Sequence, residues 1–191
     1  MGSPLKNDWE SISQPFELHY WKVKGIKDYS DEEFFKKWWK DIFDWVGEIK
    51  GEVLDIGSGV RPPLKRGYVI EPLGLEYKKI AKPEWWSDIK LYSQPAENFI
   101  PELENKIDFI LCWNSIDHGY DWIKVVDNIW KYLRNGGIVA LATDCKIERL
   151  GDHPILGVSK EQFLEIIMER FNIIKRSDDF AERDIAILLK K

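Results

Sequence analysis

The chain has 191 residues, a net charge of −5, and an ordinary balance of 44% hydrophobic and 32% charged residues. That length suits one domain with a substantial core, and no apolar run approaches the roughly 20 residues that a membrane-spanning helix needs. The acidic balance, with lysines scattered among acids, disfavours a protein dedicated to binding nucleic acid, which usually shows a basic face.

The first clear predicted element is a helix that ends before residue 50. Apolar residues recur from Phe34 to Val46 with a period near 3.6, and Ser30 with Glu33 forms a capping-box pattern at the start. We expect residues 1–50 to form a helical, tryptophan-rich extension that acts as a lid. Residues 51–191 are expected to form the main domain, in a protein of one domain overall.

Strands and helices alternate through the rest of the chain. The predicted elements are strands at 52–56, 68–71, 89–92, 106–113 and 137–143, a helix from Asp121 that stops at Asn135-Gly136, a helix capped by Ser159 and Gln162, and a hairpin from 171–176 and 184–190. This order predicts an α/β fold, a Rossmann-like three-layer sandwich. Its sheet would have seven strands, mostly parallel, with an antiparallel C-terminal hairpin.

Unusual residues follow the first two predicted strands. Gly57 and Gly59 come directly after the first strand, where missing side chains let the backbone approach a ligand. Glu71 ends the second strand, where a carboxylate can accept hydrogen bonds from a ribose diol. Ligands of open α/β sheets bind at the carboxyl ends of the strands, so we expect a nucleoside-containing ligand. The plain alternative is a tight strand exit and an exposed acid.

The charges at this position select among nucleosides. A dinucleotide fingerprint needs a third glycine that opens a helix, but here that place is taken by Pro62, and Pro62-Pro63 disrupts a helix N-terminus aimed at a pyrophosphate. Asp55 would repel a pyrophosphate and suits an ammonium group instead. S-adenosylmethionine, which has a sulfonium, an ammonium and a ribose but no phosphate, is therefore favoured.

With these residues the chain resembles the class I S-adenosylmethionine-dependent methyltransferases over roughly residues 50–145. "VLDIGSG" is similar to their first motif, "YVIEPL" to their acidic second motif, and "SQPAENF" occupies the place of the adenine-side loop. "IDFILCWNSIDHGYDW" and the later "L-x-x-G-G" turn are similar to the subset called methyltransferase type 11. Single glycine motifs are weak, but these stand in the family's order.

The resemblance implies a set of cofactor-binding residues. Gly57, Ser58 and Gly59 would lie against the methionine part of S-adenosylmethionine, with Asp55 near its ammonium and Glu71 on the ribose. The others would flank the adenine or cap the fourth strand beside the methionine, namely Pro72, Leu73, Gln94, Ala96, Glu97, Trp113 and Asn114. The chain departs from the family at Pro62 and at Pro95, which takes the place of an acid for the adenine amino group.

Three residues are candidates for catalysis. Asp117 and His118 follow the fourth strand, where methyl transfer occurs in this fold, and a histidine there can take a proton from a hydroxyl or amine nucleophile. The alternatives are a helix cap for Asp117 and a structural or substrate-orienting role for His118. His153 lies in the long loop after the fifth strand, in a His-Pro pair similar to one in some relatives.

No metal site is expected, because the three histidines lack i,i+4 spacing and the cysteines are not paired. Cys112 and Cys145 are interpreted as reduced core thiols, which points to the cytoplasm. The predicted function is S-adenosylmethionine-dependent methyl transfer to a small-molecule acceptor. A non-catalytic S-adenosylmethionine-binding or interaction protein is the alternative, and a nicotinamide-dependent oxidoreductase is a weaker one.

Overall fold

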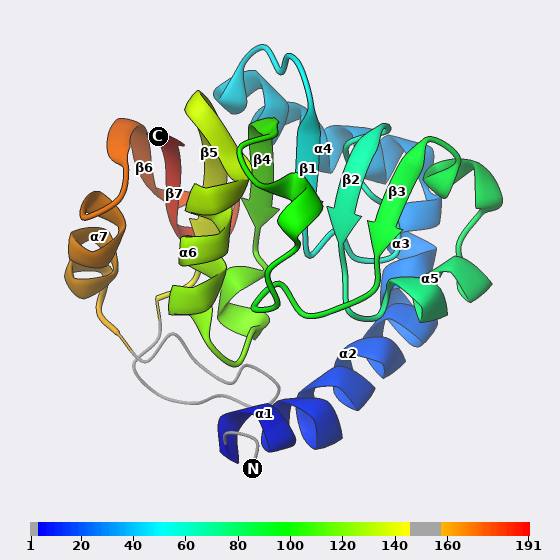
Figure 1. Cartoon of the computed structure of the whole chain (residues 1–191). Coiled ribbons are helices and arrows are strands. Elements are labelled where there is room, and N and C mark those ends of the chain that lie inside the picture. Colours follow the sequence, from blue (N-terminus) through cyan, green and yellow to red (C-terminus); the bar gives the residue numbers. More distant parts are fainter. Residues whose placement is uncertain (1–3, 146–157) are drawn as a thin grey trace.

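The computed structural model describes residues 4–145 and 158–191. Its centre is a seven-stranded sheet in the order β3-β2-β1-β4-β5-β7-β6 (Figure 1). Strands β1 to β5 pair in parallel, whereas β7 runs antiparallel to both β5 and β6. The predicted α/β sheet, mostly parallel with an antiparallel C-terminal hairpin, is confirmed.

The strands are short and rich in buried apolar residues, as both faces of the sheet are covered. Their bounds are β1 Val53–Ile56, β2 Gly67–Ile70, β3 Ile89–Tyr92, β4 Ile107–Trp113, β5 Leu133–Thr143, β6 Asn172–Phe180 and β7 Arg183–Lys190. The helices after β1 are α5 Gly74–Ile80, η3 Pro83–Trp86, η4 Pro101–Leu103, η5 Ile116–His118, α6 Trp122–Tyr132 and α7 Lys160–Met168.

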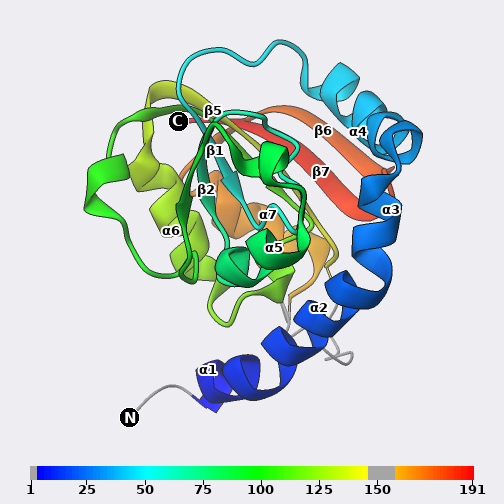
Figure 2. The ribbon, with the colours of Figure 1, turned by 90° about the vertical axis from the view of Figure 1, so that its right-hand side faces the viewer.

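Residues 4–46 are helical almost throughout. The first helix comprises α1 Pro4–Asp8, η1 Trp9–Ser13, α2 Gln14–Tyr20, η2 Trp21–Gly25 and α3 Ile26–Ser30, and it is followed by α4 Glu32–Val46. The two η segments are π-helical turns, and the junction residues keep right-handed helical dihedrals, so α1 to α3 form one N-terminal helix. That helix passes the carboxyl ends of the parallel strands and leads to α4 (Figures 1 and 2).

Apolar side chains cover the two faces of the sheet separately. On one face, α6 and α7 pack against alternate strand residues such as Leu54 and Ile110. On the other face, α4 contributes Trp39 and Ile42 to a cluster with Phe109 and its strand neighbours. This alternation follows from the period of two along a strand, and it gives the predicted three layers.

The connection from β1 to β2 contains no helix. Parallel neighbours are usually joined by a crossover of a dozen or more residues that forms a helix, but residues 57–66 form turns, bends and irregular backbone without a helix. Arg61 fixes this loop, because its guanidinium lies 3.8 Å from the ring centre of Phe35 and 4.7 Å from that of Trp85. It also donates a 2.8 Å hydrogen bond to the carbonyl of Tyr29.

Two helix boundaries differ from the prediction. Ser30 ends α3 and makes no capping box; Asp31 caps α4 instead, since its carboxylate accepts hydrogen bonds from the amides of Glu33 and Phe34. Helix α6 ends at Tyr132 rather than at Asn135-Gly136, and β5 starts at once at Leu133. A bulge in the β4–β5 pairing absorbs the extra residues, which apolar periodicity cannot reveal.

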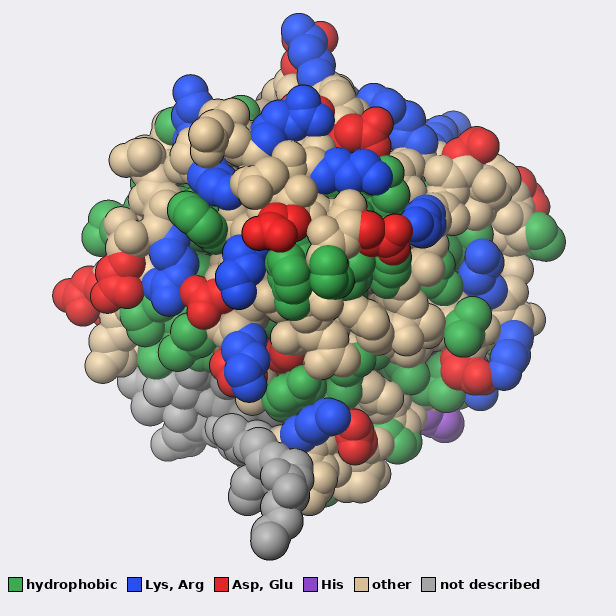
Figure 3. Space-filling model, in the orientation of Figure 1, with side chains coloured by type: hydrophobic (Ala, Val, Ile, Leu, Met, Phe, Trp, Pro, Cys, Tyr) green, Lys and Arg blue, Asp and Glu red, His purple; other side chains and the backbone are tan. Residues whose placement is uncertain are grey.

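Acidic and basic side chains are intermixed on the face seen in Figure 3, without a continuous basic area among the described residues there. No helix in the described ranges is long and apolar enough to span a membrane.

Candidate functional site

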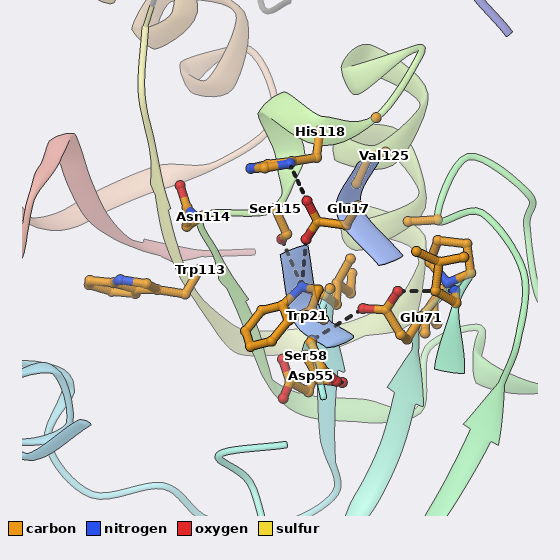
Figure 4. Close-up of a pocket in the computed structure, with 18 of the residues that line it drawn as sticks. Glu17, Trp21, Asp55, Ser58, Glu71, Trp113, Asn114, Ser115, His118 and Val125 are labelled. Carbon is orange, nitrogen blue, oxygen red and sulfur yellow. Dashed lines mark hydrogen bonds and ion pairs between the residues drawn. The ribbon is translucent and has the colours of Figure 1, made fainter. Parts of the chain in front are cut away.

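A cavity lies at the carboxyl ends of β1, β2 and β4, beneath the N-terminal helix (Figure 4). The space between its walls totals about 1180 Å³ when the part open to solvent is included. Of the predicted cofactor residues, Gln94 does not line the cavity. The others do, and they are Asp55, Gly57, Ser58, Gly59, Glu71, Pro72, Leu73, Ala96, Glu97, Trp113 and Asn114. The fold therefore brings the predicted set together.

The glycines after β1 are required by both conformation and space. Gly57 and Gly59 have φ of +74° and +63°, values that side chains other than glycine rarely adopt. A Cβ on Gly57 would lie 2.2 Å from the Cβ of Ser115, and one on Gly59 would lie 2.7 Å from Cζ2 of Trp21. The chain thus turns sharply and exposes backbone at the cavity wall.

Glu71, immediately after β2, is buried with 6% of its surface exposed. Its Oε2 accepts a 3.2 Å hydrogen bond from the amide of Gly59, and its Oε1 accepts a 3.1 Å hydrogen bond from the amide of Leu73. Burial raises the pKa of Glu71 to about 7, the charge of Glu17 adds to the rise, and the two amides oppose it. Each oxygen has lone pairs left for a further donor, such as a ribose hydroxyl.

Asp55 lies on β1 with 2% of its surface exposed. Its Oδ2 has no hydrogen-bond partner among the described residues. Burial, with a smaller contribution from the charge of Glu71, raises the pKa of Asp55 well above its usual value. A buried carboxyl without a partner suits a ligand that carries a donor or a positive charge.

The N-terminal helix contributes side chains that sequence reasoning did not place in the site. Glu17 accepts a 2.7 Å hydrogen bond from Nε1 of Trp21, and its other oxygen lies 3.7 Å from Nδ1 of His118 (Figure 4). Trp9 donates a 2.6 Å hydrogen bond to the carbonyl of His118. These contacts hold the helix against the end of β4.

The candidate catalytic residues are placed differently from one another. His118, in η5, lines the cavity with a quarter of its side chain exposed. Asp117 is buried, with its Oδ2 4.0 Å from Nε2 of His118, and it does not line the cavity. His153 lies outside the described residues.

The adenine-side loop brings Ala96 and Glu97 to the cavity but not Gln94. Gln94 donates a 3.3 Å hydrogen bond from its amide group to the carbonyl of Asn98. Glu97 accepts hydrogen bonds of 2.7 and 3.2 Å from the amides of Tyr120 and Asp121, so it also fixes the turn before α6.

Trp39 and Arg183 also line the cavity, although no pattern in the sequence predicts that either residue would lie there. Trp39 belongs to the apolar stripe of α4, which predicts only core packing. Arg183 starts β7, far from every motif. Among the described residues, no three histidine, cysteine or acidic side chains are grouped closely enough to hold a metal ion.

Residues 28–172 match the model of a family described as methyltransferase domain. The chain belongs to this family. The match covers more than half of the sequence, so the predicted class, a methyltransferase, is confirmed. Membership of the type 11 subset stays a prediction. No curated protein sequence gives a significant match.

Solved structures similar to this methyltransferase domain share its fold at low sequence identity. The 1,6-didemethyltoxoflavin-N1-methyltransferase of Burkholderia thailandensis, bound to 1,6-didemethyltoxoflavin and S-adenosylhomocysteine, aligns with a TM-score of 0.69 and 13% identity over 100% of this chain and 91% of its own. PH0226 from Pyrococcus horikoshii OT3 aligns with a TM-score of 0.68 and 10% identity over 90% and 98%. N-methyltransferase NodS from Bradyrhizobium japonicum WM9, in complex with S-adenosylhomocysteine, aligns with a TM-score of 0.61 and 17% identity over 98% of this chain and 97% of its own.

Proposed function

We propose that the protein binds S-adenosylmethionine at the carboxyl ends of β1 and β2 and transfers its methyl group to a small-molecule acceptor. One observation carries this proposal. The buried carboxylate of Glu71 stands beside the sharp Gly57–Gly59 turn at the wall of the cavity, in a chain of the methyltransferase domain family. Two similar structures hold S-adenosylhomocysteine, the product that methyl transfer leaves.

The residues present fit this cofactor. The ribose hydroxyls would donate to Glu71, whose oxygens each keep acceptor capacity. The ammonium would meet Asp55, whose Oδ2 has no hydrogen-bond partner in the described ranges. The backbone of Gly57 and Gly59 allows the close approach that the methionine part needs.

The bound cofactor supplies a sulfonium-activated methyl group. The chain must align the acceptor with it and exclude water from the cavity. We propose that residues 1–50 serve as a lid for the methyltransferase domain at 51–191. The indole of Trp21 packs against Gly59, and Glu17 joins Trp21 to His118, so the lid has to move when a ligand enters.

His118 is the proposed proton acceptor for a hydroxyl or amine nucleophile. It lines the cavity at the end of β4, and Glu17 lies within 3.7 Å of its Nδ1. That contact helps to hold the imidazole in place at the end of β4. Asp117 lies behind His118 and is proposed as a positioning residue.

A small acceptor is favoured because the N-terminal helix covers the cavity. The Burkholderia enzyme has a small heterocycle, 1,6-didemethyltoxoflavin, in its structure. The free thiols of Cys112 and Cys145 are the basis for proposing the cytoplasm as the location.

The two alternatives make different structural demands. A nicotinamide enzyme needs a helix N-terminus for the pyrophosphate, and residues 57–66 form none. A non-catalytic interaction protein would be expected to have a filled cleft, whereas this cavity lies between the N-terminal helix and His118.

Isothermal titration of the purified protein with S-adenosylmethionine, S-adenosylhomocysteine and NADH tests the proposal. We expect micromolar binding of the first two, loss of that binding in Glu71→Ala, and no binding of NADH. Glu165→Ala, on the exposed side of α7, is the matched control and should bind as the parent does. Binding of NADH alone, or equal binding by Glu71→Ala, would refute the proposal.

A further inference from the structure

Buried hydrogen-bond donors without partners belong to three residues that line the cavity. Trp39 and Trp113 expose only 7% and 6% of their surfaces, and both line the cavity. Neither indole Nε1–H has a hydrogen-bond partner among the described residues, and the same holds for the Nε–H of Arg183. Buried donors are normally satisfied, so three of them in one cavity indicate a ligand group that only accepts hydrogen bonds.

Arg183 is held in place while its Nε–H stays available. Its Nη1 donates a 2.8 Å hydrogen bond to Oδ2 of Asp144, and the other oxygen of Asp144 accepts one of 3.2 Å from the amide of Asp184. The start of β7 is thereby fastened to the end of β5. A guanidinium fixed on one side is prepared to receive an anion on the other.

Trp113 is fixed by neighbouring rings as well. Its ring centre lies 6.2 Å from that of Trp45 and 6.1 Å from that of Phe180, with steep interplanar angles at both contacts. The side chain at the end of β4 thus keeps one orientation. Figure 4 places Trp113 and Asn114 on one side of Trp21 and Glu71 on the other.

Two acceptors without partners also belong to residues that line the cavity. They are Oδ2 of Asp55 and Oδ1 of Asn114, neither of which has a hydrogen-bond partner in the part of the chain that the structure describes. Three donors and two acceptors in one cavity complement a ligand that carries both a carboxylate and an ammonium group. That pair is the α-amino-acid end of a ligand whose other end is a nucleoside.

The absence of a helix after β1 explains why side chains, rather than backbone amides, would bind the carboxylate. A helix after the glycine turn would offer backbone amides and a dipole to an anion, but residues 57–66 contain no helix. The three buried donors belong instead to cavity-lining residues of three distant elements, α4, β4 and β7.

We propose that Trp39, Trp113 and Arg183 form a carboxylate clamp that binds the methionine carboxylate of the cofactor. The clamp rests on the proposed function, because it presumes an adenosine ligand whose ribose lies at Glu71. Asp55 and Asn114 receive the adjacent ammonium. The clamp therefore sets selectivity for cofactors with an intact amino-acid end.

The test compares three ligands by calorimetry on the full chain. S-adenosylhomocysteine has the whole amino-acid end, its decarboxylated analogue lacks only the carboxylate, and 5′-methylthioadenosine lacks both groups. In Trp39→Phe and Arg183→Gln, we expect S-adenosylhomocysteine to bind about tenfold or more weakly, the effect of losing a hydrogen bond to a charged group. The other two ligands should keep their parent affinities within about twofold.

Trp38→Phe is the matched control, since Trp38 also lines the cavity but its Nε1 is not among the buried atoms that lack a partner. It should change none of the three affinities, and unchanged binding of 5′-methylthioadenosine shows that each variant is folded. Equal losses for S-adenosylhomocysteine and its decarboxylated analogue would overturn the clamp. Unchanged S-adenosylhomocysteine binding in both clamp variants would also overturn it and assign the donors to an acceptor instead. If the parent binds none of the three ligands, the proposed function itself fails.

Discussion

Glu71 should make the ligand-free protein lose stability as the pH rises through neutrality. Its pKa is raised from 4.5 to about 7 in the folded protein, mainly by burial. Between those values the folded chain keeps a proton that the unfolded chain releases. The stability contributed by protonated Glu71 is therefore complete below pH 4.5 and is lost as the pH rises through about 7.

The magnitude follows from the same values. At about 1.4 kcal/mol per pKa unit, ionising Glu71 above pH 7 costs the folded protein about 3 kcal/mol. Between pH 5 and pH 8, the part expressed is roughly 2–3 kcal/mol. Asp55 acts with the same sign, because burial raises its pKa too, so the contribution of Glu71 has to be isolated by substitution.

Urea unfolding of the parent and of Glu71→Gln at pH 5 and pH 8 measures this contribution. We expect the free energy of unfolding of the parent to fall by about 2–3 kcal/mol more than that of the variant. Glu165→Gln, at an exposed position on α7, should follow the parent. An equal fall in the parent and in Glu71→Gln, or a larger fall in the variant, would refute the reasoning.

Three further substitutions test other parts of the site. Gly59→Ala places a side chain on a backbone with φ of +63° and against Trp21. Urea unfolding should show a free energy of unfolding lower by about 1–2 kcal/mol, and S-adenosylhomocysteine should bind more weakly. Stability and binding equal to those of the parent would contradict the need for glycine. Arg61→Met removes the cation between two aromatic rings and its hydrogen bonds. Urea unfolding should show that the free energy of unfolding falls by about 2 kcal/mol. No fall would show that the loop does not depend on Arg61. His118→Gln should lower kcat for a proton-bearing acceptor by about 10²–10⁴-fold while calorimetry gives an unchanged affinity for S-adenosylhomocysteine; an unchanged kcat would exclude His118 as the base.

The strand ends were predictable because they depend on local sequence. A short apolar run sets each strand, and the residues just after it must lie at the carboxyl edge of a parallel sheet. The proximity of Gly57, Gly59 and Glu71 can therefore be predicted without knowing any contact between residues distant in the sequence. The sequence at Pro62-Pro63 also predicted locally that no helix begins after the glycine turn, and the loop that follows contains none.

The other end of the cavity could not be predicted in this way. Trp113 was predicted from its place at the end of β4, but Trp39 and Arg183 reach the cavity through the packing of α4 and the final hairpin against the sheet, which no spacing in the sequence encodes. The start of α4 was predicted one residue too early, because two neighbouring residues could both serve as its N-cap. Asp31 rather than Ser30 caps α4, because the N-terminal helix continues through Ser30 and leaves Asp31 as the first residue with extended backbone.

A crystal structure of the protein with S-adenosylhomocysteine tests the central claim most directly. The account predicts ribose hydroxyls within hydrogen-bonding distance of the Glu71 carboxylate, homocysteine backbone atoms along Gly57–Gly59, and the carboxylate facing Trp39 and Arg183. A ligand bound elsewhere, or one that leaves Glu71 without contact, would contradict it.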